Sequence, residues 1–308
     1  MGGNAISVPN QEGNIEQQFE HTCSTVKQIA DLMMAGYAPV ITHGNGPQVG
    51  SILRRVEIAS DELYPLPLEV CVADTQAGMG YMISQSLHNE LVDRGIPQEV
   101  ITLVTNVVVD EADPAFGHLS KPIGPRMSAA AAKRHEKEDD WSVMEVAPGA
   151  YRRIVPSPTP REICELDTIR QLCESGNTVI CCGGGGIPVT EENGKRTGVA
   201  AVIDKDRTTA LLANGLGIKT IVLATAVEYV CLNFGEEDEV QLRALTVAEA
   251  TEHLQTGQFG EGSMGPKVEA AINFVSGSEH ADAVAIIGHI DHLRDAVEGN
   301  SGTRIATQ

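Results

Sequence analysis

The sequence predicts an α/β protein with a mainly parallel central sheet that helices cover on both faces. Three observations favour this fold class. Short β-branched runs alternate with stretches of helical periodicity, several of these runs end in glycines, and no repeat of fixed period breaks the alternation. With 308 residues, of which 42% are hydrophobic and 21% charged, the chain is long enough to bury one large core or the cores of two lobes.

In the first half of the chain, glycines mark the ends of the predicted helices. A helix at 19–34 carries apolar residues at helical spacing and stops at Gly36, and a second helix at 70–92 stops at Gly95. The predicted strands of this half lie at 38–42, which runs into a glycine turn at 43–47, and at 100–109.

The alternation breaks down between residues 111 and 153, where charged and loop-forming residues dominate. We predict an insertion or protruding subdomain there, outside the sheet. Regular alternation returns with a predicted helix at 161–173 and continues with strands at 178–182, 220–224 and 283–287. The second half thus has a βα rhythm of its own, which predicts two lobes with a cleft between them.

The acidic composition excludes several classes of partner. A net charge of −20 argues against a nucleic-acid groove or an anionic membrane surface. No apolar run approaches the ~20 residues that span a bilayer, and no secretory signal is found. The seven cysteines show no metal-binding spacing, which favours a reducing compartment. We therefore expect a soluble cytoplasmic protein in which any anionic substrate binds to a local island of positive charge.

Three glycine-rich turns predict a phosphate site. Glycines let backbone N–H groups approach an anion, and in a parallel sheet such turns gather at the carboxyl ends of the strands. A tight turn is the plainer interpretation of any one of them. None has the Walker or Rossmann spacing, so together they favour phosphate binding by another architecture. The turns are Gly2-Gly3-Asn4, Gly44-Asn45-Gly46 and Gly183 to Gly186.

Three lysines lie in unusual settings. Lys205 stands between Asp204 and Asp206 at the start of a predicted helix, Lys267 begins another helix, and Lys121 lies in the predicted insertion. Each alone is more simply a solvated charge. A cation at a helix N-terminus is unfavourable unless an anion is near, however, and phosphoryl transfer needs such charges because its catalysis is mostly positioning and neutralisation.

Seven segments, in order along nearly the whole chain, resemble those of the carbamate kinases in the amino acid kinase superfamily. GSMGPKVEAA and CGGGGIPV separate carbamate kinases from acetylglutamate, aspartate and uridylate kinases. The segments are HGNGPQVG (43–50), SKPIGP (120–125), RRIVPSP (152–158), CGGGGIPV (182–189), AVIDKD (201–206), AVEYVCLNFG (226–235) and GSMGPKVEAA (262–271).

The resemblance implies an open three-layer α/β/α sandwich, a homodimer and the use of ATP/ADP with Mg²⁺. The implied reaction is ATP plus carbamate going reversibly to ADP plus carbamoyl phosphate, run toward ATP in arginine or agmatine fermentation. It also implies a single domain over 1–308, with an acceptor-binding lobe at 1–175 that includes the protruding subdomain at 111–153, and a nucleotide-binding lobe at 176–308.

Site residues follow from the same resemblance. The implied catalytic residues are Lys121, Lys205, Asp206 and Lys267. The acceptor would lie among Gly2, Gly3, Asn4, Gly44, Asn45 and Gly46. The nucleotide would contact Gly183, Gly184, Ala226, Tyr229, Asn233, Met264 and Lys267. No side chain is predicted as a direct metal ligand: Mg²⁺ would be held by nucleotide phosphates, with Asp204 or Asp206 nearby.

Two departures from the family pattern are visible. The family has an apolar strand before its Gly-Gly-Asn turn, whereas this chain begins with Met1 and Gly2. We expect either that loss of this strand weakens the core and loosens the acceptor turn, or that the start codon is misassigned. Ala77 stands where the family has glycine, and we expect its methyl group to be tolerated.

Several conspicuous residues receive no catalytic role. His43 is not needed as a base, because carbamate is already an anionic nucleophile, and a structural role is predicted for it. Arg152 and Arg153 are predicted to lie beside the insertion, away from the acceptor, so that no arginine grips a distal carboxylate. This predicts a pocket for a very small anion. Two alternatives stay open: a kinase of another small acid or phosphonate, and a non-catalytic nucleotide-binding relative.

Overall fold

The computed structural model describes residues 1–2, 13–260 and 264–308. The helices are α1 (Ile15–Met34), α2 (Gly46–Ile58), α3 (Leu68–Asp93), α4 (Ala129–Glu138), α5 (Leu166–Glu174), α6 (Lys205–Leu216), α7 (Val247–Gln255), α8 (Met264–Gly277) and α9 (Leu293–Glu298). The strands of the first half are β1 (Val100–Thr102), β2 (Asn106–Val108), β3 (Lys121–Ser128), β4 (Val143–Ala147) and β5 (Ala150–Val155). Those of the second half are β6 (Glu162–Ile163), β7 (Thr178–Ile180), β8 (Ile187–Glu192), β9 (Lys195–Gly198), β10 (Thr220–Thr225), β11 (Val230–Leu232), β12 (Val240–Leu242), β13 (Ala244–Thr246), β14 (Val284–His289) and β15 (Thr303–Ala306).

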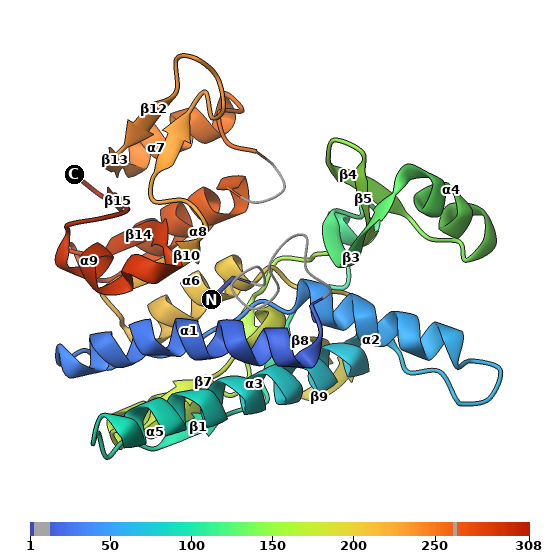
Figure 1. Cartoon of the computed structure of the whole chain (residues 1–308), viewed down its shortest axis with the longest axis horizontal. Coiled ribbons are helices and arrows are strands. Elements are labelled where there is room, and N and C mark those ends of the chain that lie inside the picture. The colour runs from blue at the N-terminus through green and yellow to red at the C-terminus, as the bar shows by residue number, and fades with distance from the viewer. Residues whose placement is uncertain (3–12, 261–263) are drawn as a thin grey trace.

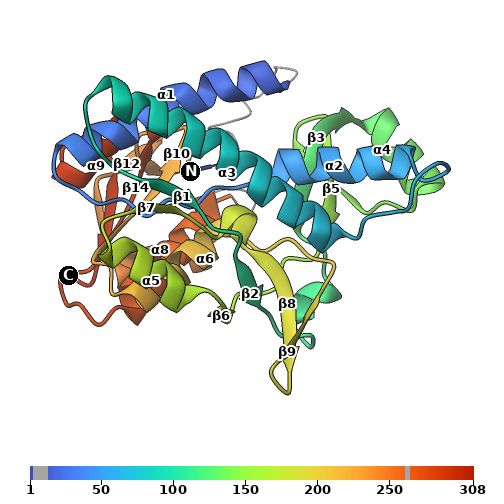
Figure 2. The same ribbon diagram turned by 90° about the horizontal axis from the view of Figure 1, so that it is seen from below.

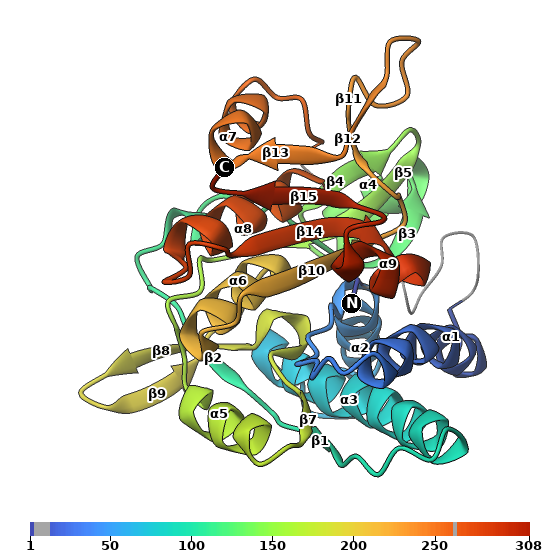
Figure 3. The ribbon, with the colours of Figure 1, turned by 90° about the vertical axis from the view of Figure 1, so that its left-hand side faces the viewer.

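Two central sheets lie between layers of helices. The first pairs β1 with β7 in parallel, and Ile41 extends it by a bridge to Ile180. The second has the order β10-β14-β15-β13, in which only β14 and β15 run antiparallel. Helices α5, α6 and α8 cover one side and α1, α3 and α9 the other (Figure 3). The predicted α/β/α sandwich with a mainly parallel sheet is therefore confirmed.

The second sheet carries a large apolar core. Phe274 of α8 is fully buried there, with Ile287 of β14 and Ile305 of β15. Apolar residues recur on α8 at a spacing that turns them toward the sheet, which is why this segment packs as a helix. Among the described residues, no helix combines the length and apolar character needed to cross a membrane.

The prediction of one strand at 100–109 is wrong. β1 belongs to the first central sheet, whereas β2 pairs with β6 and β8 in a separate sheet. The chain changes sheets at Thr105, whose backbone N–H and carbonyl are both held by the buried side chain of Gln76. Tertiary contacts therefore divide a run that is rich in β-branched residues in sequence.

Two other predicted boundaries also need correction. The strand predicted at 38–42 pairs only at Ile41. The helix predicted at 161–173 begins at Leu166, because residues 162–163 form β6 against β2.

Met1 lies between the two central sheets. Its amine donates a hydrogen bond to the carbonyl of Thr42 (2.7 Å), and its carbonyl accepts one from the N–H of Gly44 (3.0 Å). Its side chain packs against an apolar cluster that includes Ile41 and Ala224. In the part of the chain that the structure describes, no strand joins the two sheets across this position.

A small unit of residues 121–155, here called the protruding unit, stands apart from the central layers (Figures 1 and 2). It consists of the antiparallel sheet β3-β5-β4 and helix α4. β3 packs tightly on α2 at Gly50, where an added Cβ would lie 2.1 Å from the backbone nitrogen of Gly124. The unit is thus docked on α2 by direct contact between backbones.

Candidate active site

A cavity of about 520 Å³ opens where the protruding unit faces the carboxyl ends of the central strands. Three helices begin at its wall, with Gly46 of α2, Lys205 of α6 and Met264 of α8 among the lining residues. Helix N-termini present unpaired N–H groups and positive potential, and they therefore favour an anionic ligand.

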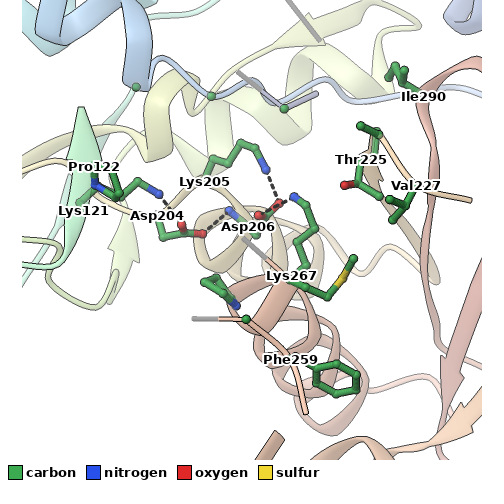
Figure 4. A pocket seen from close by; sticks show the side chains of 18 of the residues that line it. Lys121, Pro122, Asp204, Lys205, Asp206, Thr225, Val227, Phe259, Lys267 and Ile290 are labelled. Atoms are coloured by element: carbon green, nitrogen blue, oxygen red, sulfur yellow. Dashed lines mark hydrogen bonds and ion pairs between the residues drawn. The ribbon is translucent and has the colours of Figure 1, made fainter. Parts of the chain in front are cut away.

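The centre of the cavity is a buried charge cluster. Asp206, in the first turn of α6, accepts hydrogen bonds from the Nζ atoms of both Lys205 and Lys267, the latter at 2.9 Å (Figure 4). Burial alone would raise the pKa of Asp206, but the two ammonium groups outweigh it and hold that pKa far below the usual value. Asp206 therefore stays ionised and fixes both lysines in place.

The two lysines differ in their ionisation. Burial lowers the pKa of Lys267 to about 8, because the attraction of Asp206 does not compensate for lost hydration and for repulsion by Lys205. For Lys205 the balance is reversed: burial opposes the charge, but Asp206 and Asp204 raise its pKa. Lys205 is thus charged at neutral pH, whereas Lys267 loses its proton at about pH 8 in the ligand-free site.

The protruding unit contributes a third lysine. Lys121, at the start of β3, donates to the carboxylate of Asp204. Asp204 is also the N-cap of α6, and it accepts from the N–H of Asp206 at 2.8 Å. Its burial is opposed by the charge of Lys121, which lowers its pKa. One carboxylate therefore joins the protruding unit to the helix that carries Lys205.

The glycine turns approach the cavity from the central strands. Gly184, in a left-handed conformation (φ 67°), lies against Asn45, where an added Cβ would come within 2.2 Å of the amide nitrogen. Asn45 is itself oriented by a hydrogen bond to Thr75 (2.8 Å). Gly2, Gly44 and Gly46 also line the cavity. These positions offer backbone amides and one short side chain to an acceptor.

Some predicted site residues lie elsewhere. Gly183 packs against His43 and does not line the cavity. His43 is buried, and burial lowers the pKa of its ring to about 4, so it is neutral at physiological pH. Asn233 donates to Asp238 (2.8 Å) rather than facing the cavity. Gly3 and Asn4 fall outside the described residues.

At the other end of the cavity, the predicted nucleotide contacts Ala226, Tyr229 and Met264 are found among the lining residues. Phe234, Phe259 and Cys231 line it as well, although the sequence analysis did not select them. Phe234 follows the predicted nucleotide contact Asn233 and belongs to the matched segment AVEYVCLNFG, so its position was within reach of prediction. Phe259 precedes the motif of Lys267, and no local signal marks it.

The largest correction concerns Arg152. It was predicted to lie away from the acceptor, yet it lines the cavity beside Gly46 and Lys121. Residues alternate between the faces of β5, so Arg152 and its neighbour Arg153 point in opposite directions. Burial, with a smaller effect of Arg126, lowers the pKa of Arg152 to about 10, which leaves it charged at neutral pH.

The cavity is therefore cationic in an acidic protein. Four positive side chains face two carboxylates, in a chain whose net charge is −20. Among the residues that the structure describes, no group of three or more His, Cys, Asp or Glu side chains is arranged to hold a metal ion. An anionic ligand with several negative charges suits such a site.

Comparison with known proteins agrees with this geometry. The model of the amino acid kinase family matches residues 1–286. Carbamate kinase of Pyrococcus horikoshii is 44% identical over 99% of this chain and 97% of its own. The solved structure of carbamate kinase from Giardia lamblia bound to citric acid has a TM-score of 0.94 at 36% identity, covering 99% of this chain and 96% of that chain. The structure of the same enzyme bound to AMP-PNP gives 0.88 at 37% identity, with the same coverage.

The fold and the cationic cavity define a kinase, and the chain belongs to the amino acid kinase family. Within that family, the relatives that it matches over nearly its full length include the carbamate kinases of Pyrococcus horikoshii and Giardia lamblia, so the resemblance read from the seven segments is confirmed.

Proposed function

We propose that the protein catalyses reversible phosphoryl transfer between ATP and carbamate, giving ADP and carbamoyl phosphate. The observation that carries this proposal is the cluster of Lys205, Asp206 and Lys267, completed by the Lys121–Asp204 pair across the cavity. Full-length similarity to carbamate kinases and the AMP-PNP complex of the Giardia enzyme support both the reaction and the phosphoryl donor.

In this proposal a carboxylate oxygen of carbamate attacks the γ-phosphorus of ATP. A new O–P bond forms as the bond to the β-phosphate bridging oxygen breaks, and ADP leaves with the electron pair. Lys205 and Lys121 neutralise the charge that spreads over the transferred oxygens, and Lys267 binds the nucleotide phosphates at the N-terminus of α8. No general base is needed, which agrees with a neutral His43 outside the cavity.

We propose Mg²⁺ as cofactor, held mainly by phosphate oxygens. Mg²⁺ prefers oxygen ligands and usually keeps several of its waters. The carboxylates of Asp204 and Asp206 are the acidic groups of the cavity, but both are engaged by lysines. They fit a role next to the hydrated ion rather than as a protein cage. When bound, Mg²⁺ would neutralise phosphate charge.

The acceptor end favours a very small anion. Its wall is made by glycine turns, and an added Cβ on Gly46 would already lie 3.3 Å from the carbonyl oxygen of Pro122. With backbone close by, this part of the cavity suits a small anion better than the skeleton of acetylglutamate or the uridine of UMP. We therefore propose carbamate as the acceptor, with weak side activity toward acetate or bicarbonate.

The decisive measurement is ATP formation from ADP and carbamoyl phosphate by the purified chain. A panel of carbamate, acetate, bicarbonate, acetylglutamate, aspartate and UMP at matched concentration, followed by ADP release, then tests the acceptor. A Lys205→Met variant purified in the same way controls for contaminating kinases. Turnover of acetylglutamate or UMP with carbamate inert would overturn the proposal, and nucleotide binding without any turnover would favour the non-catalytic alternative.

The wider setting is proposed on the resemblance alone. We propose a cytoplasmic homodimer that forms ATP in arginine or agmatine fermentation, with an acceptor lobe at 1–175, which includes the subdomain at 111–153, and a nucleotide lobe at 176–308. Light scattering would report the mass in solution, and a gene neighbourhood or growth experiment would test the pathway.

A further inference from the structure

Arg152 has an incomplete set of hydrogen bonds in a buried setting. Its Nε donates to the carbonyl oxygen of Gly124 at 2.8 Å, which ties β5 to the irregular part of β3. Its Nη2 is shielded from solvent, and within the described residues it has no hydrogen-bond partner. No ion pair of the described residues includes Arg152. A buried guanidinium N–H without a partner is costly, so such a group is expected to have one when the protein works.

The position of this group relates it to the acceptor. Nη2 lies 3.5 Å from the place that a Cβ of Gly46 would occupy, at the first residue of α2. Gly46 belongs to the turn whose neighbours Gly44 and Asn45 line the cavity together with Lys121 and Arg152. The free N–H of Arg152 thus lies at the acceptor end, whereas Met264 and Phe259 line the nucleotide end.

Arg153, the next residue of β5, is an arginine whose contacts lie entirely within the protein. Arg153 donates to Glu57 of α2 at 2.5 Å and lies over the ring of Trp141, 4.7 Å from its centroid. Its charge is therefore neutralised within the protein. Arg152, one position away on the opposite face, has no carboxylate partner, although the chain carries 42 acidic residues.

We propose that Arg152 is an acceptor-binding residue. Its free N–H donates to a carboxylate oxygen of carbamate and, in the reverse direction, to the corresponding oxygen of carbamoyl phosphate. The proposal rests on the proposed function, and it adds a fourth cation to the three lysines. It also gives the segment RRIVPSP a role that the sequence analysis left open.

Steady-state kinetics with ADP and carbamoyl phosphate test the role of Arg152. For Arg152→Ala we expect the KM for carbamoyl phosphate to rise about tenfold to a hundredfold, as for loss of one hydrogen bond to a charged group, while the KM for ADP changes less than about twofold. Arg152→Lys restores part of the loss, and added guanidinium partly rescues the alanine variant. Lys133→Gln, which removes an exposed charge of α4 in the same unit and outside the cavity, is the matched control and keeps wild-type constants.

Several results would reject the role. An unchanged KM for carbamoyl phosphate in Arg152→Ala rejects it, and so does an equal rise in both KM values with no response to guanidinium, since that marks a structural residue. If Arg152→Ala does not fold, the same comparison is made with Arg152→Gln. If the wild type does not turn over carbamoyl phosphate, the proposed function fails separately. Calorimetry with inorganic phosphate then decides on Arg152, because loss of phosphate binding in Arg152→Gln supports an anion site and equal binding rejects it.

Discussion

The two cationic walls of the cavity are built in different ways. Lys205 and Lys267 stand at the N-termini of α6 and α8, two helices that pack on each other and on the second central sheet, and Asp206 links their ammonium groups. Lys121 and Arg152 stand on the protruding unit, whose three strands and one helix reach the rest of the protein mainly through α2. Figure 4 shows the two walls joined by the Lys121–Asp204 contact.

The difference in construction predicts a difference in rigidity between the two walls. The first wall is held by the buried network of Lys205, Asp206 and Lys267. Separating these groups would leave a buried charge without a partner, which is costly, so we expect this wall to be rigid. The second wall is carried by a small unit with its own attachment, which is the arrangement expected of an element that closes over substrates. Variants of the two walls should therefore respond differently if the first is fixed and the second closes.

The largest effect is expected for Lys205→Ala. Loss of a fixed charge at the transferred phosphoryl group should lower kcat by about a hundredfold to a thousandfold, with a much smaller change in nucleotide affinity. Single-turnover kinetics and ADP binding measured on the same preparation check this. A variant with more than about half of the wild-type turnover would remove Lys205 from the mechanism.

Lys121→Ala should lower kcat by about a hundredfold, and it should also uncouple the protruding unit from α6, because it removes the contact with Asp204. In the wild type we expect proteolytic nicking between residues 111 and 153 to slow when both substrates bind. Emission of Trp141, the one tryptophan of the sequence, should change at the same time, because this residue of the protruding unit donates a hydrogen bond to Glu57 of α2. Equal cleavage rates and emission with and without ligands would contradict a closing unit.

ADP affinity should depend on pH because of Lys267, in the first wall. Lys267 has a pKa of about 8, so in the ligand-free enzyme it is charged below that pH and neutral above it. ADP affinity should therefore fall about tenfold per pH unit above pH 8. The fall should end at the higher pH at which Lys267 loses its proton in the ADP complex as well, because bound phosphates favour the charged lysine. Because this pKa is below the unfolded value of 10.5, the same group should make unfolding harder as pH rises from 8 to 10.5.

Calorimetric titration of ADP between pH 7 and 10 checks the effect. Lys267→Arg, which keeps its charge in this range, should remove most of the dependence. Lys219→Arg, at an exposed site paired with Asp282, should leave it intact. A wild-type affinity that does not vary across this range would show that Lys267 stays charged in the free enzyme.

The smallest effect is expected for Arg153→Gln. This change removes the contact with Glu57 and the stacking on Trp141, both partly exposed, so we expect a loss of about 1–2 kcal/mol in the free energy of unfolding. The KM for carbamoyl phosphate should stay near the wild-type value, which is the contrast with Arg152→Ala. Denaturant unfolding and kinetics on one preparation compare the two. A rise in that KM equal to the rise for Arg152→Ala would remove the contrast.

Sequence patterns predicted much of the rigid wall. Lys205 and Lys267 were marked by their position at helix starts, because a cation there is unfavourable without an anion, and that argument depends only on neighbouring residues. Helices α1 and α3 were placed within five residues, because each has a stop signal at a glycine. The resemblance of seven short segments supplied the family.

Only the folded chain decided the place of Arg152 in the other wall and several boundaries. Arg152 and Arg153 are adjacent and chemically identical, and which of them faces the cavity depends on the register of β5 against β3, to which the local sequence has no access. The change of sheet at Thr105 likewise depends on Gln76, 29 positions earlier. Residue identity thus determined the chemistry that this protein can perform and the helices that carry the lysines. Pairing between distant segments determined which charges meet, because register and packing are set by contacts that no local pattern encodes.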